Sequence, residues 1–441
     1  MEIRDPLHGT IRLSPQELRV IESQEFQRLR AIKQLGFAEF SFPGATHNRF
    51  LHSIGVCHLA GMAFDTIFQK LRLPASKKQE GFRQLIRLAA LLHDIGHGPL
   101  SHTTEDMMPF LEDLKVPVYK YRAHPYGQLP LNSDQENKKK RATHEDYTIK
   151  YITDSPLTEV INQCYQDFTP YHVALVIDRS LQEQDDFFID HGINFRPLLT
   201  QLISSELDVD RLDYLERDSF FCGTNYGKVD THWLISHMTA HLEQGRMFLA
   251  INRRALYTFD DFLLARHHMH LMVYFHHKSI IYEEMLNRFL MSEDCTFRLP
   301  ADINEYTKYN DYKLFEVIAN SNNPWARRIA EKKLFKVLIE LHSTEPSNRP
   351  LKIKELIESE NIPVIWASSQ TRLSKYHSTI PGESSPPIFV VDVYNPWDKP
   401  YKIDEATEIF QKYEGTRIID RIYVQPEHLE FALQLLSRCK F

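Results

Sequence analysis

Residues 83–102, RQLIRLAALLHDIGHGPLSH, form the stretch that decides the fold. Leucine, isoleucine and alanine recur there at helical spacing, which predicts a helix over residues 83–97 with one strongly apolar face. His93 and Asp94 stand side by side near its end, and His97 follows one turn later on the same face. Imidazole and carboxylate groups gathered at the end of a buried helix suit a divalent transition metal. A lone His-Asp pair is more often a polar helix end that faces water, so the metal interpretation depends on the other motifs.

Composition narrows the class of protein. The chain has 441 residues, which predicts one large domain plus a smaller lobe. Its net charge of −7 provides no global basic field, so nucleic-acid binding is compatible with the sequence but not indicated by it. The run from Lys138 to Arg141 is expected to be solvated surface.

Cysteine usage and the N-terminus bear on the compartment. The five cysteines are scattered, odd in number and form no CxxC motif, which favours reduced thiols over disulfides or a cysteine zinc site. The N-terminal MEIRDPLHG is charged and lacks an apolar signal region, and no run is long enough to cross a membrane. We therefore expect a cytoplasmic protein that does not associate with a membrane.

The periodicity predicts a mainly α protein whose character changes near residue 300. Before that point it predicts an extended piece over 1–13 and helices over 15–36 (broken near Ser23), 49–72, 83–97, 144–168, 197–218 and 257–291. After it come helices over 311–320, 324–341 and 426–438 and strands at 363–366, 388–391 and 418–424. We therefore expect a core over residues 1–300 and a smaller C-terminal α+β lobe over 301–441.

Four candidate metal ligands come from three separate helices. They are His52, His93, Asp94 and Asp210. Two imidazoles and two carboxylates leave coordination positions open for water and substrate, as hydrolytic metal sites require. No local spacing such as HExxH joins them, so the fold must bring them together.

Cationic and imidazole side chains accompany these ligands, and a polyphosphate needs such groups because arginine binds phosphate oxygens in bidentate fashion. They are Arg49, His97, His102, His144, Arg211 and Arg266. Each alone is more often a surface or capping residue, so their number beside the His-Asp pair carries the argument.

Two helices also carry polar residues four positions apart. The sets are Asp210, Tyr214 and Asp218 on one helix and Arg266, His270 and Tyr274 on the other. Such stripes form a pocket wall or simply the polar face of an amphipathic helix. Asp213 and Arg217 form an i, i+4 pair, whose ordinary use is to stabilise the helix.

These residues stand in motifs that resemble the deoxynucleotide triphosphohydrolase branch of the HD-domain phosphohydrolases. That branch includes the vertebrate enzyme with a sterile alpha motif and bacterial relatives without it. The matching motifs are DPLHG at 5–9, FQRLR at 26–30, KQLG at 33–36, FPGA at 42–45, HNRF at 47–50, HDIGHGP at 93–99 and DVDRLDY at 208–214. The resemblance covers residues 1–290 by motif and the C-terminal lobe more weakly.

The resemblance implies an HD-type helical core over residues 1–300 and a reaction in which a dNTP and water give a deoxynucleoside and inorganic triphosphate. It implies that His52, His93, Asp94 and Asp210 bind the metal, whose identity stays open among Mn, Fe, Ni, Zn and Mg. His102 would donate a proton to the departing 5′-oxygen. Glu105 stands where the family has an Asp that orients this histidine, so its arm is longer.

The resemblance also implies a substrate pocket. The phosphate-contacting positions are Arg49, His97, His144, Arg211 and Arg266. Gln34 and Asp218 match positions that bind the 3′-hydroxyl of the sugar. Tyr214 and Tyr274 match the walls around the sugar, with Leu35 nearby and His270 on the same helix stripe as Tyr274. Crowding at the sugar would exclude a 2′-hydroxyl and so select deoxyribose.

The family also has an allosteric site for an activating nucleotide between subunits, and it forms homo-oligomers, dimers or tetramers built as dimers of dimers. Gln27 and Arg30 match that site, whereas Glu22 replaces its guanine-recognising Asp and Met1 replaces a Lys. We therefore expect either activation with an altered base preference or none. Two alternatives stay open: an HD hydrolase of another phosphoester, such as (p)ppGpp, a nucleoside monophosphate or RNA ends, and a non-catalytic module that senses nucleotides or binds single strands.

Overall fold

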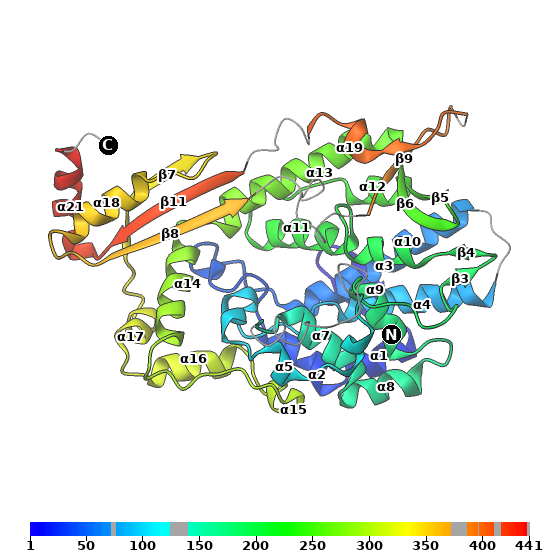
Figure 1. Cartoon of the computed structure of the whole chain (residues 1–441), viewed down its shortest axis with the longest axis horizontal. Helices are drawn as coiled ribbons and strands as arrows, with labels where there is room; N and C mark the ends of the chain where they lie inside the picture. The colour runs from blue at the N-terminus through cyan, green and yellow to red at the C-terminus, as the bar shows by residue number, and fades with distance from the viewer. Residues whose placement is uncertain (72–75, 124–139, 372–385, 396, 410–415, 439–441) are drawn as a thin grey trace.

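The computed structural model describes residues 1–71, 76–123, 140–371, 386–395, 397–409 and 416–438, and it is mainly helical (Figure 1). Before residue 300 the helices are α1 (Pro15–Ile21), α2 (Gln24–Gln27), α3 (Arg49–Leu71), α4 (Lys77–Leu92), α5 (Leu111–Leu114), α7 (His144–Thr153), α8 (Pro156–Cys164), α9 (Pro170–Ile177), α10 (Arg196–Ile203), α11 (Val209–Phe221), α12 (Thr231–His237), α13 (Leu256–Met269) and α14 (His277–Leu290). Short 3-10 turns are η1 (Arg28–Ala31), η2 (Ala38–Phe40), η3 (Ser101–Met107), η4 (Pro117–Tyr121) and η5 (Arg253–Ala255).

The remaining helices are α15 (Ile303–Tyr306), α16 (Asp311–Asn320), α17 (Pro324–Ala330), α18 (Arg349–Glu358), α19 (Ile403–Ala406), the 3-10 turn η7 (Pro426–His428) and α21 (Leu429–Ser437). Three small sheets complete the fold. The first sheet pairs β1 (Glu2–Asp5) with β2 (Gly9–Arg12). The second has the strand order β10 (Tyr401–Lys402), β9 (Phe389–Val391), β6 (Arg246–Asn252), β4 (Ile193–Asn194) and β3 (Ile189–Asp190), with β5 (Met238–Glu243) also paired to β6. The third has the order β7 (Lys336–Ser343), β11 (Arg417–Val424) and β8 (Val364–Thr371). The expectation of a mainly α fold with a smaller α+β lobe is confirmed.

The helix α3 lies at the centre of the core. Among the described helices it alone is long and apolar enough to cross a membrane, but 72% of its apolar window is buried inside the molecule. It packs against α4 and α11, so burial of apolar side chains from all three helices fixes their ends relative to one another. Two of the candidate metal ligands lie on α3 and α11, and the other two directly follow the C-terminus of α4.

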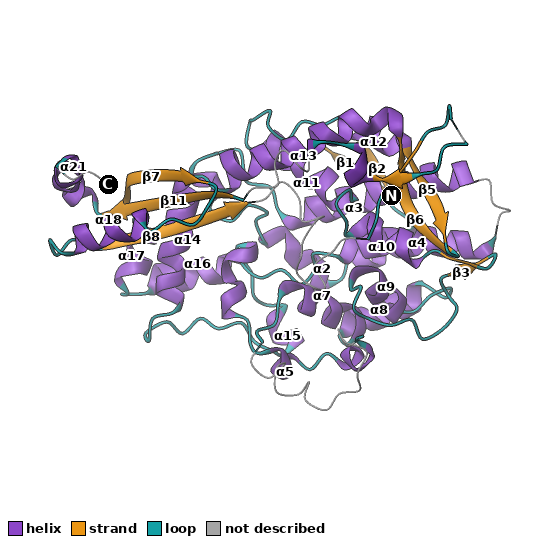
Figure 2. Cartoon of the chain, turned by 45° about the horizontal axis from the view of Figure 1, so that its top comes forward, coloured by secondary structure: helices purple, strands orange, loops and turns teal. Residues whose placement is uncertain are grey.

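The smaller lobe is a three-stranded antiparallel sheet with α18 and α21 on one face (Figure 2). Its own core is a separate cluster of buried residues: Leu338, Ile353, Ile357, Ile362, Ile422, Val424 and Ala432. Between β8 and β11 the chain returns to the main core, where β9 pairs parallel with β6. The domain boundary at residue 300 stays a prediction, although α15 and α16 contact the core: Asp311 accepts hydrogen bonds from the backbone N–H groups of Lys33 and Leu100.

Several predicted helices are shorter or broken. The helix expected over 83–97 ends at Leu92, so His93 and His97 do not share a helical face. The chain turns there and packs tightly, because a Cβ on Gly96 would lie 2.0 Å from the carbonyl oxygen of His144. The helix expected over 15–36 is indeed broken at Ser23, which caps α2.

Three other long helices predicted from the sequence are interrupted in the structure, so those predictions were wrong. Residues 144–168 form α7 and α8, separated at Ser155, and residues 197–218 form α10 and α11, separated where Asp208 caps α11. Residues 257–291 contain α13, a π-helical turn η6 (His270–Tyr274) and α14, so the expected stripe of four-residue spacing is interrupted.

The helix expected over 324–341 was also wrong. It ends at Ala330, and β7 begins at Lys336, because a short apolar run has no periodicity that separates helix from strand. The hairpin of β5 and β6 was not predicted, although Gln244 and Gly245 both have positive φ, as tight hairpin turns require. The cysteines Cys57, Cys164, Cys222 and Cys295 are free, as expected, and Cys439 lies outside the described residues, as do Lys138 and Lys139.

Candidate metal centre and active site

The four candidate metal ligands converge on one point. The Nε2 atom of His52 lies 3.0 Å from Oδ1 of Asp210 and 3.5 Å from Oδ2 of Asp94. The Nε2 atom of His93 lies 3.4 Å from Oδ1 of Asp94 and 3.5 Å from Oδ1 of Asp210. The three helices α3, α4 and α11 therefore bring together two imidazole nitrogens and two carboxylates.

The chemistry of this cluster fits a divalent ion. The Nδ1 atom of His52 contacts Asp213, and the Nδ1 atom of His93 contacts the carbonyl oxygen of Ala90, so each Nε2 faces the cluster. Within the described part of the chain, neither buried Nε2 atom makes a well-aligned hydrogen bond, although both lie within 3.5 Å of carboxylate oxygens. A buried polar atom without a partner is costly, and a metal ion would satisfy both.

Electrostatics also favour a positive charge at this point. Burial opposes protonation of His52, yet the carboxylates of Asp210 and Asp213 raise its pKa to about 10. Burial likewise raises the pKa of Asp94, but Arg49 and the neighbouring histidines outweigh it and hold that pKa well below the usual range. Both aspartates of the cluster are therefore available as carboxylates at neutral pH.

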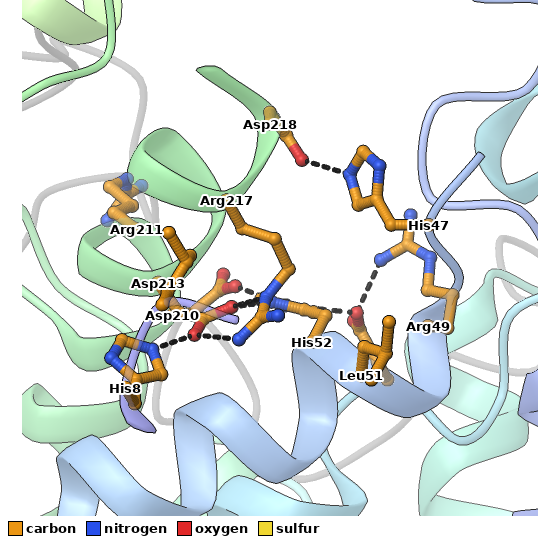
Figure 3. Close-up of polar contacts among 12 residues, drawn as sticks. His8, His47, Arg49, Leu51, His52, Asp210, Arg211, Asp213, Arg217 and Asp218 are labelled. Carbon is orange, nitrogen blue, oxygen red and sulfur yellow. Dashed lines mark hydrogen bonds and ion pairs between the residues drawn. The ribbon is translucent and has the colours of Figure 1, made fainter. Parts of the chain in front are cut away.

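A buried network of hydrogen bonds and ion pairs orients His52 from its Nδ1 side, away from the metal cluster (Figure 3). Asp213 accepts at 2.8 Å from His52 and binds Arg217, whose guanidinium also reaches Asp5 at 2.9 Å. The Nε2 atom of His8 contacts Asp213 at 2.6 Å. The predicted pair of Asp213 and Arg217 is present, but it is fully buried and orients a metal ligand instead of lying on the surface.

The site opens into a cavity of about 730 Å³, a volume that suits a small-molecule ligand. The predicted metal-binding, catalytic and substrate-binding residues that line it are Gln34, Leu35, Arg49, Asp94, His97, His102, His144, Asp210, Arg211, Tyr214, Asp218, His270 and Tyr274. The structure thus brings most of the predicted pocket together.

The three predicted phosphate-binding arginines are each paired with a carboxylate. Arg49 binds Asp94 and also Ser101, and Arg211 binds Asp208. Arg266 binds Glu206 at 2.6 Å and is not among the residues that line the cavity. Of the three arginines, Arg49 and Arg211 therefore face the cavity directly.

The predicted catalytic group gathers on the cavity wall. Glu105 contacts Nδ1 of His144 closely, whereas its distance to Nδ1 of His102 is 3.5 Å. The side chain of His102 is 65% exposed, so it is the member of this group most open to solvent. The expected pairing of Glu105 with His102 stays a prediction, and the glutamate also contacts His144, which lies closer to it.

His97 completes this group. Its ring stacks on that of His144 with centroids 3.8 Å apart, and its Nε2 lies 3.2 Å from Asp94. Burial and the charge of Arg49 lower the pKa of His97 well below its usual value, so this imidazole is neutral. The group of His97, His102, Glu105 and His144 has ligand atoms close enough to hold a cation as well.

The predicted sugar-binding residues form a second hydrogen-bonded set. Asp218 contacts Nε2 of His47 at 2.8 Å and accepts from the hydroxyl of Tyr274 at 2.8 Å. Tyr214 packs against Tyr274 with ring centroids 6.4 Å apart. His47 and His8 were not predicted to have a role, although they stand in the HNRF and DPLHG motifs, and that position was the available signal.

The three residues of the predicted activator site lie together near the N-terminus. Gln27 donates to the carbonyl oxygen of Ile21 and accepts from Arg30 at 2.8 Å. Arg30 lies 3.5 Å above the ring centroid of Phe50, and Glu22 is exposed at the end of α1. A role for these three residues in binding an activating nucleotide stays a prediction.

Comparison with known proteins agrees with this geometry. Residues 49–218 match the HD domain and residues 229–361 match the HD associated region. A crystal structure of a hypothetical protein from Aquifex aeolicus is 27% identical, has a TM-score of 0.73 and covers 99% of both chains. A phosphohydrolase structure from Bacteroides thetaiotaomicron, 20% identical with a TM-score of 0.65, shares the fold.

Two relatives illustrate the range of similarity. An uncharacterized protein of Mycoplasma pneumoniae is 30% identical over 71% of this chain and 64% of its own length. The human deoxynucleoside triphosphate triphosphohydrolase SAMHD1 is 27% identical over 89% of this chain and 62% of its own length. The chain spans about three fifths of the length of the curated relatives that it matches.

The helical core and the His/Asp cluster define an HD-domain protein. The chain belongs to the HD-domain family, and its relatives include deoxynucleoside triphosphate triphosphohydrolases.

Proposed function

We propose that this protein hydrolyses dNTPs to deoxynucleosides and inorganic triphosphate. The observation that carries the proposal is the position of the His52, His93, Asp94 and Asp210 cluster at a cavity lined by Arg49 and Arg211. A divalent ion held by these four residues would supply charge neutralisation at a phosphate oxygen and a lowered pKa for water. Membership of a family with dNTP-hydrolysing relatives supports the substrate class.

The arginines would bind the triphosphate by changing partners. Arg49 and Arg211 are held by Asp94 and Asp208, so their guanidinium groups are already placed at the cavity wall. Phosphate oxygens accept bidentate hydrogen bonds from arginine, and such charge-assisted bonds strengthen where water is excluded. The neutral imidazole of His97 has a single N–H, which faces Asp94, so it would donate to a phosphate oxygen only in exchange for that contact.

The chemical step needs one proton donor. Water adds to the α-phosphorus, the bond from phosphorus to O5′ breaks, and its electron pair stays on O5′. His102 would give a proton to that oxygen, while the proton lost by the attacking water passes to solvent. The exposed side chain of His102 can reach the leaving group, and Glu105 between His102 and His144 would hold the protonated form.

The remaining pocket would hold the deoxyribose. Asp218 is fixed by His47 and Tyr274, yet a carboxylate has further lone pairs with which to accept from a 3′-hydroxyl. Tyr214 and Tyr274 would form the sugar walls, with Gln34 and Leu35 opposite. A 2′-hydroxyl would meet these walls, which favours deoxyribose.

The test is product analysis. Purified protein supplemented separately with Mn²⁺, Fe²⁺, Ni²⁺, Zn²⁺ or Mg²⁺ is incubated with each dNTP, and the products are separated by chromatography. We expect deoxynucleoside and triphosphate, a loss of activity in Asp94→Ala, and a decrease of about 10²–10⁴-fold in His102→Ala. The exposed His232 provides the matched control, since His232→Ala should leave the rate unchanged.

The alternatives give different outcomes in the same assay. Orthophosphate or pyrophosphate from another nucleotide would support a different HD phosphohydrolase. Binding of nucleotides without turnover under every metal would support the non-catalytic alternative, and either result would contradict the proposed reaction.

We also propose an activating nucleotide at Glu22, Gln27 and Arg30 between subunits of a homo-oligomer. Rates with single dNTPs are compared with rates in mixtures, and the mass in solution is measured with and without nucleotide. Rates that stay the same on mixing, together with an unchanged mass, would argue against it.

A further inference from the structure

Two polar side chains on one face of α14 line the cavity and have no assigned role. They are Ser279 and Glu283, which stand one turn apart and therefore project to the same side of the helix. Among the described residues, the buried hydroxyl of Ser279 has no hydrogen-bond partner. The side chain of Glu283 is half-buried, and no described residue forms a hydrogen bond or ion pair with its carboxyl group. Two such groups lining one cavity point to a ligand that supplies their partners.

Charge decides which part of a nucleotide they can meet. The cations of the cavity, Arg49 and Arg211, lie beside the metal ligands and suit the triphosphate. A carboxylate at Glu283 would repel phosphate oxygens, so α14 suits the uncharged end of the ligand. Val273 and Phe275 line the same cavity and can cover the faces of a planar ring.

We propose that Ser279 and Glu283 recognise the hydrogen-bonding edge of a guanine base, which makes dGTP the preferred substrate. This proposal rests on the proposed function. A serine hydroxyl can donate to O6, and a carboxylate can accept from N1–H and the N2 amino group together. Thymine presents an acceptor, a donor and a second acceptor along this edge, so one of its carbonyl oxygens would face the carboxylate.

The protonation state of Glu283 is consistent with this role. Burial, and to a lesser extent the neighbouring Glu284, raise the pKa of Glu283 to about 7. Two N–H donors from guanine would stabilise the carboxylate form. A half-buried carboxyl group without a partner costs stability in the free protein and is retained where a ligand makes use of it.

The test measures kcat/KM for dGTP, dITP, dATP, dCTP and dTTP in the wild type and in Glu283→Gln, Glu283→Ala and Ser279→Ala. We expect dGTP to exceed dTTP by about tenfold or more and dITP, which lacks the N2 amino group, to be intermediate. Either change at Glu283 should lower the value for dGTP about 10–100-fold and leave that for dTTP within about threefold. Glu284→Gln is the matched control, because Glu284 binds Arg288 and does not line the cavity.

Two results would overturn the proposal: equal wild-type values for all bases, or a loss in Glu283→Ala that is equal for all of them. Failure of the dNTP reaction itself is separated by calorimetric binding of deoxyguanosine and thymidine, which needs no phosphate chemistry. Tighter binding of deoxyguanosine by about tenfold, lost in Glu283→Gln, would support base recognition even without dNTP hydrolysis. Equal binding of both nucleosides would refute it.

Discussion

At the scale of single residues, burial changes what a familiar pair of charges does. Asp213 and Arg217 have the i, i+4 spacing of an ordinary surface pair, which contributes a few tenths of a kcal/mol. In the fold both side chains are fully buried, and Asp213 contacts His52 and His8 as well. The same spacing therefore serves to orient a metal ligand, which spacing alone does not reveal.

Replacement of Asp213 tests this role. Asp213→Asn keeps the size but removes the charge that pairs with Arg217 and orients His52, so we expect metal affinity to fall about 10–100-fold. The free energy of unfolding should fall by about 3–5 kcal/mol, as for other broken buried ion pairs. Competition with a coloured chelator and denaturant titration measure the two quantities, and the exposed Asp261→Asn is the control. An unchanged metal affinity would show that Asp213 serves the fold alone.

The raised pKa of Glu283 makes a prediction about stability. Its carboxyl group titrates near pH 7 in the folded protein but near 4.5 when unfolded, so the folded state holds the proton longer. The free energy of unfolding should therefore fall as pH rises from 4.5 to 7, by up to about 3 kcal/mol. In Glu283→Gln this part of the fall should be absent. Thermal unfolding of both proteins at pH 4.5 and pH 8 measures it, and parallel curves would contradict an unpaired carboxyl group.

At the scale of elements, two helical glycines differ sharply in their surroundings. A Cβ on Gly55 in α3 would lie 2.0 Å from Oδ1 of Asp213 and 2.4 Å from the Arg217 guanidinium, so α3 and α11 approach through this point. A Cβ on Gly81 in α4 would meet only ordinary contact at 3.6 Å.

These glycines form a matched pair of substitutions. Gly81→Ala should raise the free energy of unfolding by about 0.5–1 kcal/mol, because alanine favours a helix over glycine. Gly55→Ala should lower the free energy of unfolding by about 1–3 kcal/mol through overpacking. It should also weaken metal binding, because the added methyl group displaces Asp213 and Arg217, which orient His52. Denaturant titration measures the free energy of unfolding, and competition with a chelator measures metal affinity. Similar stability in both variants would mean that α3 and α11 separate without cost.

Elements with a clear period could be predicted, and their interruptions could not. The helices around 49–71 and 77–92 follow from apolar spacing, and the break near Ser23 between α1 and α2 was also predicted. The breaks at Asp208 and Phe275 carry function, because one caps the helix of Asp210 and the other follows the π-helical turn that places Tyr274. Contacts with other parts of the fold impose such breaks, so the apolar periodicity of the local sequence does not predict them.

At the scale of the whole molecule, the site is made by packing. His52, the pair of His93 and Asp94, and Asp210 are separated by up to 158 positions, and resemblance to a family, not spacing, joined them before the fold was known. The same resemblance placed Glu105 beside His102, and in the fold Glu105 lies between His102 and His144, closer to His144. The residues that no motif role indicated, Ser279 and Glu283, emerge only from the cavity that they line.

Because three core helices supply the ligands, a metal ion should stabilise the entire core. An ion that binds the folded state alone adds about 4 kcal/mol to the free energy of unfolding at a thousand times its dissociation constant. We expect calorimetry to show a higher midpoint with Mn²⁺ than with chelator in the wild type and in the exposed control Asp398→Ala. Asp94→Ala should lose this shift, since the ligands then hold the helix ends through fewer bonds to the ion. A shift that persists in Asp94→Ala but disappears in His144→Ala would instead assign the ion to the neighbouring group of His97, His102, Glu105 and His144, whose ligand atoms also lie close together.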